Sequence, residues 1–146
     1  MCNDTASATT AITTAMPAGN VWVSDIIGED FKNWESGRVI LDCGTGRGKN
    51  EFIIKKLARW LVDEMLTGGK RSRILYLCPL TSLHAEMIRR RFEAEIAEMG
   101  EEVAAEFPIY EEILEVQTYQ YIETRRRNAP ALLEEYLAGF KYIVVD

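Results

Sequence analysis

Three glycines and a lysine within residues 43–50 give the sequence its strongest chemical signal. The segment reads Cys-Gly-Thr-Gly-Arg-Gly-Lys-Asn, and it lies between an apolar run and a stretch with helical spacing of apolar residues. Glycine lets a backbone wrap around an anion with its N–H groups pointing inward, and the start of a helix adds partial positive charge. A lysine at the end of such a loop reaches the terminal phosphates of a nucleotide. The residues predicted to bind ATP, with a plain glycine-rich turn as the alternative, are Gly44, Thr45, Gly46, Arg47, Gly48, Lys49 and Asn50.

Two positions differ from the strict phosphate-loop pattern G-x-x-x-x-G-K-[ST]. Cys43 replaces the first glycine, which is a mild change. Asn50 replaces the Ser or Thr whose hydroxyl binds Mg²⁺. An amide oxygen can bind Mg²⁺, but it lies farther from the backbone, and Mg²⁺ requires near-ideal octahedral geometry. We therefore expect either a weakened metal site at Asn50 or nucleotide binding with poor turnover.

A second candidate for metal binding is the aspartate at the end of the sequence. Residues 142–146 read Tyr-Ile-Val-Val-Asp. An apolar strand that ends in an acid has the form of a Walker B strand, whose aspartate holds Mg²⁺. Asp146 is therefore predicted to be a metal ligand, with a buried strand followed by a turn as the alternative.

The elements that must position these residues alternate between strand and helix. Short apolar runs predict strands over residues 38–42, 73–78, 113–118 and 141–146. Helical spacing predicts helices over residues 51–66, 82–99, 119–127 and 130–138. Residues 93–115 hold nine acids and no base, which predicts a solvated helix end and a loop. The alternation predicts an α/β fold with a parallel sheet, helices on both faces and ligands at the carboxyl ends of the strands.

Composition limits the classes of protein to consider. The chain has 146 residues, which is room for one domain, and its net charge of −6 argues against non-specific coating of nucleic acid. Residues 1–20 lack aromatic side chains and are predicted to be flexible, which leaves 21–146 as the domain. No apolar run approaches the roughly 20 residues of a membrane helix. Three cysteines without metal-like spacing predict free thiols in a reducing, cytoplasmic compartment.

Four segments, taken in order, resemble superfamily 2 helicase-like ATPases of the DEAD/DEAH-like or restriction-enzyme type. They are GTGRGKN from residue 44, LYLCPLTSL from residue 75, VQTYQYIE from residue 116 and YIVVD from residue 142. The resemblance covers residues 21–146 and implies the N-terminal part of the first of two RecA-like domains in a P-loop NTPase. It implies that Lys49 binds the β and γ phosphates and that Asp146 binds Mg²⁺ through water.

The resemblance also implies a nucleic acid, DNA or RNA, as a partner of the complete protein. Thr81 and Ser82 match one nucleic-acid-facing motif, and Thr118 matches the next one loosely. Capping a helix or ending a strand is the alternative role of these residues. In that family a glutamate follows the Walker B aspartate, and a second RecA-like domain supplies an arginine finger. The sequence stops before both, so we expect a truncated chain with negligible ATP hydrolysis.

Three functions stay open on the sequence alone. The first is the ATP-binding portion of a nucleic-acid-dependent helicase or translocase. The second is a degenerate or truncated module that binds nucleotide or nucleic acid without ATPase activity, which Asn50 favours. The third is a small P-loop kinase, which needs an arginine-rich lid, and only the runs at 89–91 and 125–127 offer one. Phe31 and Trp34 are predicted to pack in the core rather than to stack on a base.

Overall fold

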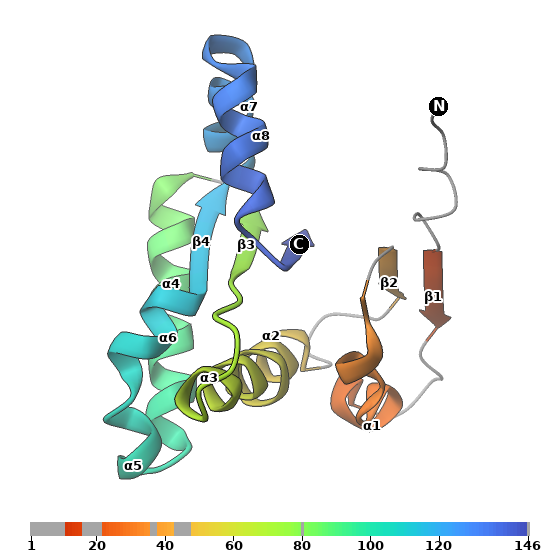
Figure 1. Cartoon of the computed structure of the whole chain (residues 1–146), viewed down its shortest axis with the longest axis vertical. Helices are drawn as coiled ribbons and strands as arrows, with labels where there is room; N and C mark the ends of the chain where they lie inside the picture. The colour runs from red at the N-terminus through yellow and green to blue at the C-terminus, as the bar shows by residue number, and fades with distance from the viewer. Residues whose placement is uncertain (1–10, 16–21, 36–37, 43–47, 80, 146) are drawn as a thin grey trace. The chain divides into compact units, whose positions relative to one another are not determined.

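The computed structural model describes residues 11–15, 22–35, 38–42, 48–79 and 81–145 (Figure 1). Its contacts divide the chain into two compact units, Met1–Phe52 and Ile53–Asp146, where the sequence predicted one domain over residues 21–146. Each unit contains a parallel sheet and helices of its own. The α/β class is confirmed in this coarse form.

The smaller unit contains a two-stranded sheet. β1 (Ala11–Ala15) pairs in parallel with β2 (Arg38–Asp42), and β2 spans the strand that the sequence predicted. β1 differs from the prediction that residues 1–20 are flexible, and the rest of that segment lies outside the described residues. Isoleucine and threonine are β-branched and favour strands once a neighbouring strand offers an edge to pair with.

An aromatic cluster forms the core of the smaller unit. Phe31 lies in η2 (Asp30–Asn33), a single 3₁₀ turn that follows α1 (Val23–Ile27), and Trp34 comes directly after it. Both rings pack against Phe52, the last residue of α2 (Lys49–Phe52). The ring of Phe52 lies 5.6 Å from that of Phe31 and 6.2 Å from that of Trp34, centroid to centroid. Phe31 is only 1% exposed, so its predicted role in packing is confirmed.

The helix that follows the glycine-rich segment contains a π turn. It runs through α2, η3 (Ile53–Ala58) and α3 (Arg59–Leu66), and η3 has π geometry where the sequence predicted one regular helix over residues 51–66. Buried residues recur in pairs every four positions: 53–54, 57–58 and 61–62. Because a π turn holds more residues than an α turn, it keeps both members of each pair on the core side.

The larger unit is built on a three-stranded parallel sheet. β3 (Ile74–Cys78) lies between β4 (Leu114–Thr118) and β5 (Tyr142–Val145), and all five residues of β3 are buried. Ile74 pairs with Leu114 on one side and with Tyr142 on the other. The strands predicted over residues 73–78, 113–118 and 141–146 are therefore present, with small shifts at their ends.

The helices of the larger unit follow the predicted order with one correction. α4 (Ser82–Glu98), α7 (Tyr119–Asn128) and α8 (Pro130–Ala138) match predicted helices, and Figure 1 shows α7 and α8 beyond the carboxyl ends of β3 and β4. The loop predicted within residues 93–115 was wrong, because α5 (Glu101–Ala104) and α6 (Phe107–Ile113) form there. Tyr110 and Ile113 are at most 1% exposed, so their burial supports α6 despite the acidic sequence around it.

No helix within the described ranges is both long and apolar enough to cross a membrane.

Candidate functional site

Gly48 is the part of the predicted phosphate loop with the most demanding geometry. Its φ is +85°, and a Cβ atom placed there would lie 2.9 Å from Cε3 of Trp22. The backbone conformation therefore favours glycine, and a side chain there would have to displace the exposed ring of Trp22. The carbonyl of Gly48 accepts the N–H of Phe52 at 2.9 Å, which is the first hydrogen bond of the helical stretch.

Lys49 and Asn50 begin that helical stretch and are both half-buried. The structure thus places three of the predicted phosphate-binding residues together, at the junction of a tight turn and a helix of residues 49–66. Gly44, Thr45, Gly46 and Arg47 lie outside the described residues. The first N–H groups of a helix have no partners inside it, so this junction offers donors to an anion.

Asp146, the second predicted metal ligand, also lies outside the described residues. The strand before it is described: Val145 pairs with Leu77 in the parallel ladder of β5 and β3. The described residues contain no group of three or more His, Cys, Asp or Glu side chains arranged to hold a metal ion.

The three residues predicted to contact nucleic acid follow the carboxyl ends of two neighbouring strands. Thr81 and Ser82 come after β3, and both side chains are exposed. Thr81 occupies the N-cap position of α4, but its side chain makes no capping hydrogen bond. Thr118 ends β4 and is 9% exposed, and its hydroxyl accepts the N–H of Tyr121 at 3.1 Å. Thr118 is therefore an N-cap of α7, whereas Thr81 and Ser82 face solvent.

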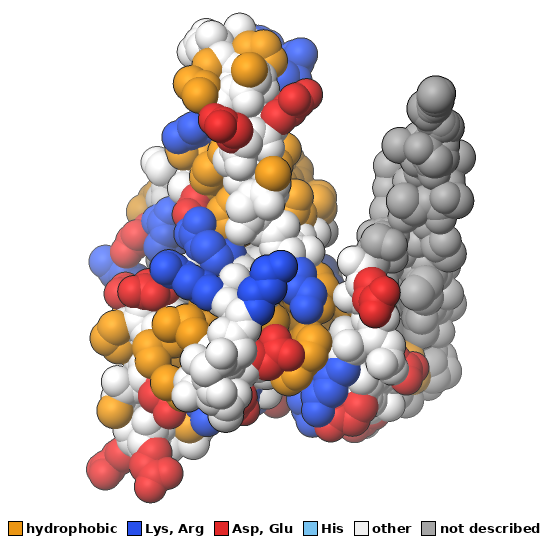
Figure 2. Space-filling model, in the orientation of Figure 1, with side chains coloured by type: hydrophobic (Ala, Val, Ile, Leu, Met, Phe, Trp, Pro, Cys, Tyr) orange, Lys and Arg blue, Asp and Glu red, His pale blue; other side chains and the backbone are white. Residues whose placement is uncertain are grey.

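The arginine runs make local contacts. Arg89 donates to the carbonyl of Val116 at 2.7 Å and to Glu86 at 3.1 Å. Arg126 and Arg127 both pair with Glu123, one turn earlier on α7. On the face shown in Figure 2, Lys and Arg side chains gather near the middle of the larger unit, with Asp and Glu side chains at the margin of the group. These pairs leave the runs less suited to a kinase lid, which must place its arginines on phosphate.

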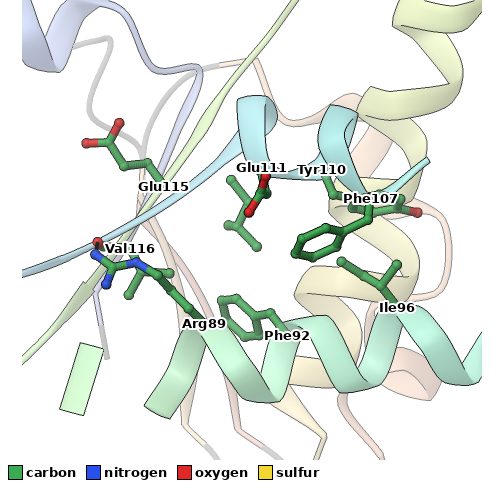
Figure 3. Close-up of a pocket in the computed structure, with 9 residues that line it drawn as sticks. Arg89, Phe92, Ile96, Phe107, Tyr110, Glu111, Glu115 and Val116 are labelled. Carbon is green, nitrogen blue, oxygen red and sulfur yellow. Dashed lines mark hydrogen bonds between the residues drawn. The ribbon is translucent and has the colours of Figure 1, made fainter. Parts of the chain in front are cut away.

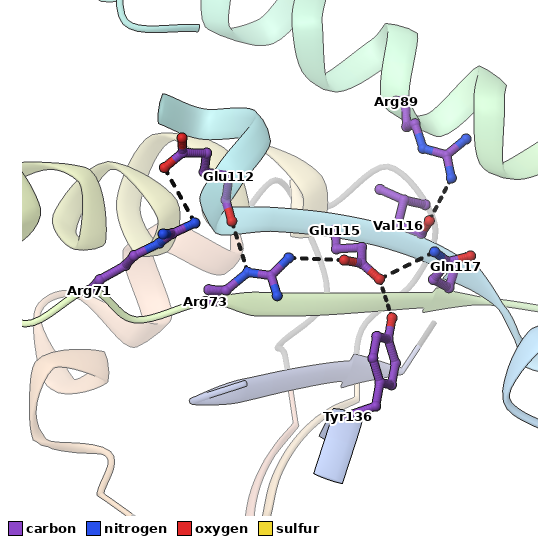
Figure 4. A network of polar contacts seen from close by, with 8 residues as sticks. All are labelled: Arg71, Arg73, Arg89, Glu112, Glu115, Val116, Gln117 and Tyr136. Carbon is purple, nitrogen blue, oxygen red and sulfur yellow. Dashed lines mark hydrogen bonds and ion pairs between the residues drawn. The ribbon is translucent and has the colours of Figure 1, made fainter. Parts of the chain in front are cut away.

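A polar cluster around Glu115 was not predicted from the sequence. Its carboxylate accepts hydrogen bonds from Arg73 at 2.9 Å, from Gln117 at 3.2 Å and from the Tyr136 hydroxyl (Figure 4). Burial alone would raise the pKa of Glu115, but the three donors outweigh burial and hold that pKa below its ordinary value. Burial, and then the hydrogen bond to Glu115, raise the pKa of Tyr136. The cluster therefore favours a charged glutamate and a neutral tyrosine.

The same arginine ties the cluster to the rest of the sheet. Nε of Arg73 donates to the carbonyl of Glu112 at 2.9 Å, and its guanidinium lies 4.7 Å from the centroid of the Phe140 ring. Arg71 pairs with the Glu112 carboxylate at 3.3 Å. Every polar group named here has a partner within the cluster, so the arrangement joins β3, β4 and α8 rather than presenting groups to a substrate.

An apolar groove lies between α4 and α6, with β4 as its floor (Figure 3). Figure 3 shows Phe92 and Ile96 facing Phe107 and Tyr110 across it, with Arg89 at one end. It holds about 210 Å³, which is less than the roughly 300–1,000 Å³ of most ligand pockets. A groove of this size suits one apolar side chain and no nucleotide.

Comparison with family models, with curated proteins and with solved structures finds no match to this chain. The geometry around Gly48 and the order of the motifs are therefore the grounds on which a function is proposed.

Proposed function

We propose that this chain binds ATP through residues 44–50 and is the nucleotide-binding part of a nucleic-acid-dependent ATPase of the superfamily 2 helicase type. The observation that carries the proposal is Gly48. A glycine with φ of +85°, followed at once by a lysine and the start of a helix, is compatible with the end of a phosphate loop.

The helix after Gly48 supports phosphate binding electrostatically. The helical stretch covers residues 49–66, so many aligned peptide dipoles contribute to the positive potential at its start. Lys49 lies at that start and adds a full charge. In the proposal its ammonium group contacts the β and γ phosphates, and the RecA-like architecture of a P-loop NTPase is the fold in which it does so.

The proposed metal is Mg²⁺, held by Asn50 and Asp146. The position of Asn50 fits, because it lies in the first turn of the helix, directly after the proposed phosphate-binding lysine. Its donor is an amide oxygen rather than a hydroxyl, which fits Mg²⁺ less well. When bound, Mg²⁺ would neutralise charge on the phosphates.

A nucleic acid is the proposed partner because of the edge formed by the carboxyl ends of β3 and β4. Thr81 and Ser82 lie there with exposed side chains. Hydroxyl groups beside the start of α4 can donate to backbone phosphates of a strand. Thr118 contributes less, because its hydroxyl already caps α7.

Asn50 favours a second candidate function, a module that binds nucleotide without hydrolysing it. With a weakened metal site, the phosphate charge would be poorly neutralised during hydrolysis while ground-state binding through Lys49 would persist. Turnover measured beside binding separates the two candidates.

Calorimetric titration of ATP into the full chain tests the proposal. We expect Lys49→Ala to weaken ATP binding roughly 10- to 150-fold, because a charge-assisted hydrogen bond contributes about 1.5–3 kcal/mol. Lys56→Ala is the matched control: Lys56 lies in the same helical stretch and is exposed, so ATP affinity should stay within twofold. Equal affinities of the Lys49→Ala and Lys56→Ala variants would refute the phosphate-loop interpretation.

A further inference from the structure

A polar hollow of about 450 Å³ lies at the amino ends of β3 and β5. Its walls come from the end of α3, from the turn at residues 67–72 and from Lys141, the residue before β5. The N–H of Lys141 donates to the carbonyl of Arg73 at 2.9 Å, which fixes Lys141 beside the start of β3. Because the strands are parallel, the hollow lies at the edge of the sheet opposite Thr118 and Val145.

Ser72 is the most informative residue of this hollow. It is only 8% exposed, and it lines the hollow. Among the described residues its hydroxyl has no hydrogen-bond partner. The Ser72 side chain is therefore held at the wall of the hollow, where its hydroxyl can donate to an acceptor.

Two lysines bring positive charge to the same space. In the described part of the chain, neither Lys70 nor Lys141 has a carboxylate within ion-pair distance of its ammonium group. The ammonium group of Lys141 lies 5.0 Å from the ring centroid of Trp60 and 5.4 Å from that of Tyr142. These contacts restrict the Lys141 side chain, so less side-chain entropy is lost when its ammonium group binds an anion.

The remaining titratable groups at the hollow leave it cationic. Glu64 lines it and carries the one acidic side chain among its walls. The residue after Lys141 is Tyr142, whose hydroxyl is buried and has no hydrogen-bond partner among the described residues. Burial, and then the charge of Glu64, raise the pKa of Tyr142, so this hydroxyl stays a neutral donor. The walls of the hollow therefore carry two lysines and the Ser72 hydroxyl beside a single carboxylate, that of Glu64.

We propose that this hollow binds a phosphate group, with Lys70, Lys141 and Ser72 donating to its oxygens. A phosphate supplies several acceptor oxygens and a negative charge, which are what these side chains lack. The site does not depend on the proposed ATP function, since it shares no residue with the loop at 44–50. The group is either free phosphate or a phosphate of a nucleic acid backbone, and both have the same chemistry.

Amide chemical shifts of the ¹⁵N-labelled full chain test the site. Inorganic phosphate is titrated against chloride at equal ionic strength, and we expect shifts in the amides of residues 68–72. Lys70→Ala and Ser72→Ala should each weaken phosphate binding at this site at least fivefold, and Lys56→Ala should leave it within twofold. Lys49→Ala should also leave it unchanged, which separates this proposal from the ATP site.

A short single-stranded oligonucleotide forms the second arm. Shifts at the same amides, reduced by Ser72→Ala, would assign the phosphate to a nucleic acid backbone, and a response to inorganic phosphate alone would assign it to the free ion. Ser72→Ala removes a hydroxyl without a partner, so without phosphate its melting temperature should equal or exceed that of the parent chain. The proposal is overturned if neither probe shifts residues 68–72, or if Lys70→Ala and Ser72→Ala bind phosphate as the parent chain does.

Discussion

Replacing Tyr136 with phenylalanine removes one donor from the cluster around Glu115. The Tyr136 hydroxyl donates to the Glu115 carboxylate, whose side chain is 25% exposed. A hydrogen bond to a charged group contributes about 1.5–3 kcal/mol, and partial exposure to solvent reduces that value. We therefore expect the free energy of unfolding of the larger unit to fall by about 1–2 kcal/mol at pH 7.

The effect of Tyr136→Phe should depend on pH in a defined direction. The pKa of Glu115 is lowered in the folded state, so its contribution to stability is present above the ordinary value of 4.5 and is lost as pH falls through the lowered pKa. The difference between the parent chain and the variant should therefore shrink below about pH 4. At high pH the raised pKa of Tyr136 has the opposite consequence: the parent chain loses stability once tyrosine ionises in the unfolded state, above about pH 10.

Urea unfolding at pH 7 and pH 3, followed by the fluorescence of Trp60 in α3, measures this difference. Tyr121→Phe is the matched control, because the Tyr121 ring packs 5.9 Å from that of Tyr136 and its hydroxyl has no hydrogen bond among the described residues. The control should change stability by less than about 0.5 kcal/mol. If Tyr136→Phe costs no more than the control, or costs as much at pH 3 as at pH 7, the account of this cluster is wrong.

Three further predictions concern the loop and the helix starts. Gly48→Ala should destabilise the chain by about 1–2 kcal/mol in thermal unfolding, because alanine is strained at φ +85° and its Cβ meets the Trp22 ring at 2.9 Å. In a Trp22→Ala background the loss should be smaller, because only the backbone strain remains. Thr118→Ala should lower the free energy of unfolding by about 1 kcal/mol, because the α7 cap is lost. Thr81→Ala removes no capping bond and should change stability little. Equal losses of stability in urea unfolding would contradict the capping assignment. Asn50→Thr should leave the melting temperature nearly unchanged and make ATP affinity rise more steeply with Mg²⁺. ATP titrations of both forms with Mg²⁺ and with chelator measure this. The same Mg²⁺ dependence in both forms would mean that Asn50 lies away from the metal or is already a competent ligand.

The strands and the main helices could be predicted from the sequence because their signals are local. β2 is a run of apolar residues that ends before glycines, and it forms over residues 38–42 as expected. α8 begins at Pro130, which is favoured in the first turn of a helix, and it matches its predicted range. The π turn was not predicted, because apolar residues at positions 53, 54, 57, 58, 61 and 62 are also what the buried face of an α-helix shows.

The candidate site could be predicted only where backbone geometry follows from residue type. Gly48 was one of three glycines expected to let the loop backbone turn tightly, and its φ of +85° is a conformation that favours glycine. Glu115 and Tyr136 were missed because they meet across 21 positions of sequence, and no local pattern reports such an approach. The hollow at Ser72 was missed for the same reason, since Lys141 reaches it only after β5 pairs with β3.

The full burial of β3 has a consequence for how the larger unit opens. β3 pairs on both edges and all five of its residues are buried, so its amide hydrogens should exchange only when the whole unit unfolds. α7 lies at the other extreme: all ten of its residues are described and none is buried. Its amide hydrogens should exchange through local fraying, long before the sheet opens. α7 is thus expected to open before α8, which the Tyr136–Glu115 hydrogen bond and the buried Leu133 join to the rest of the unit.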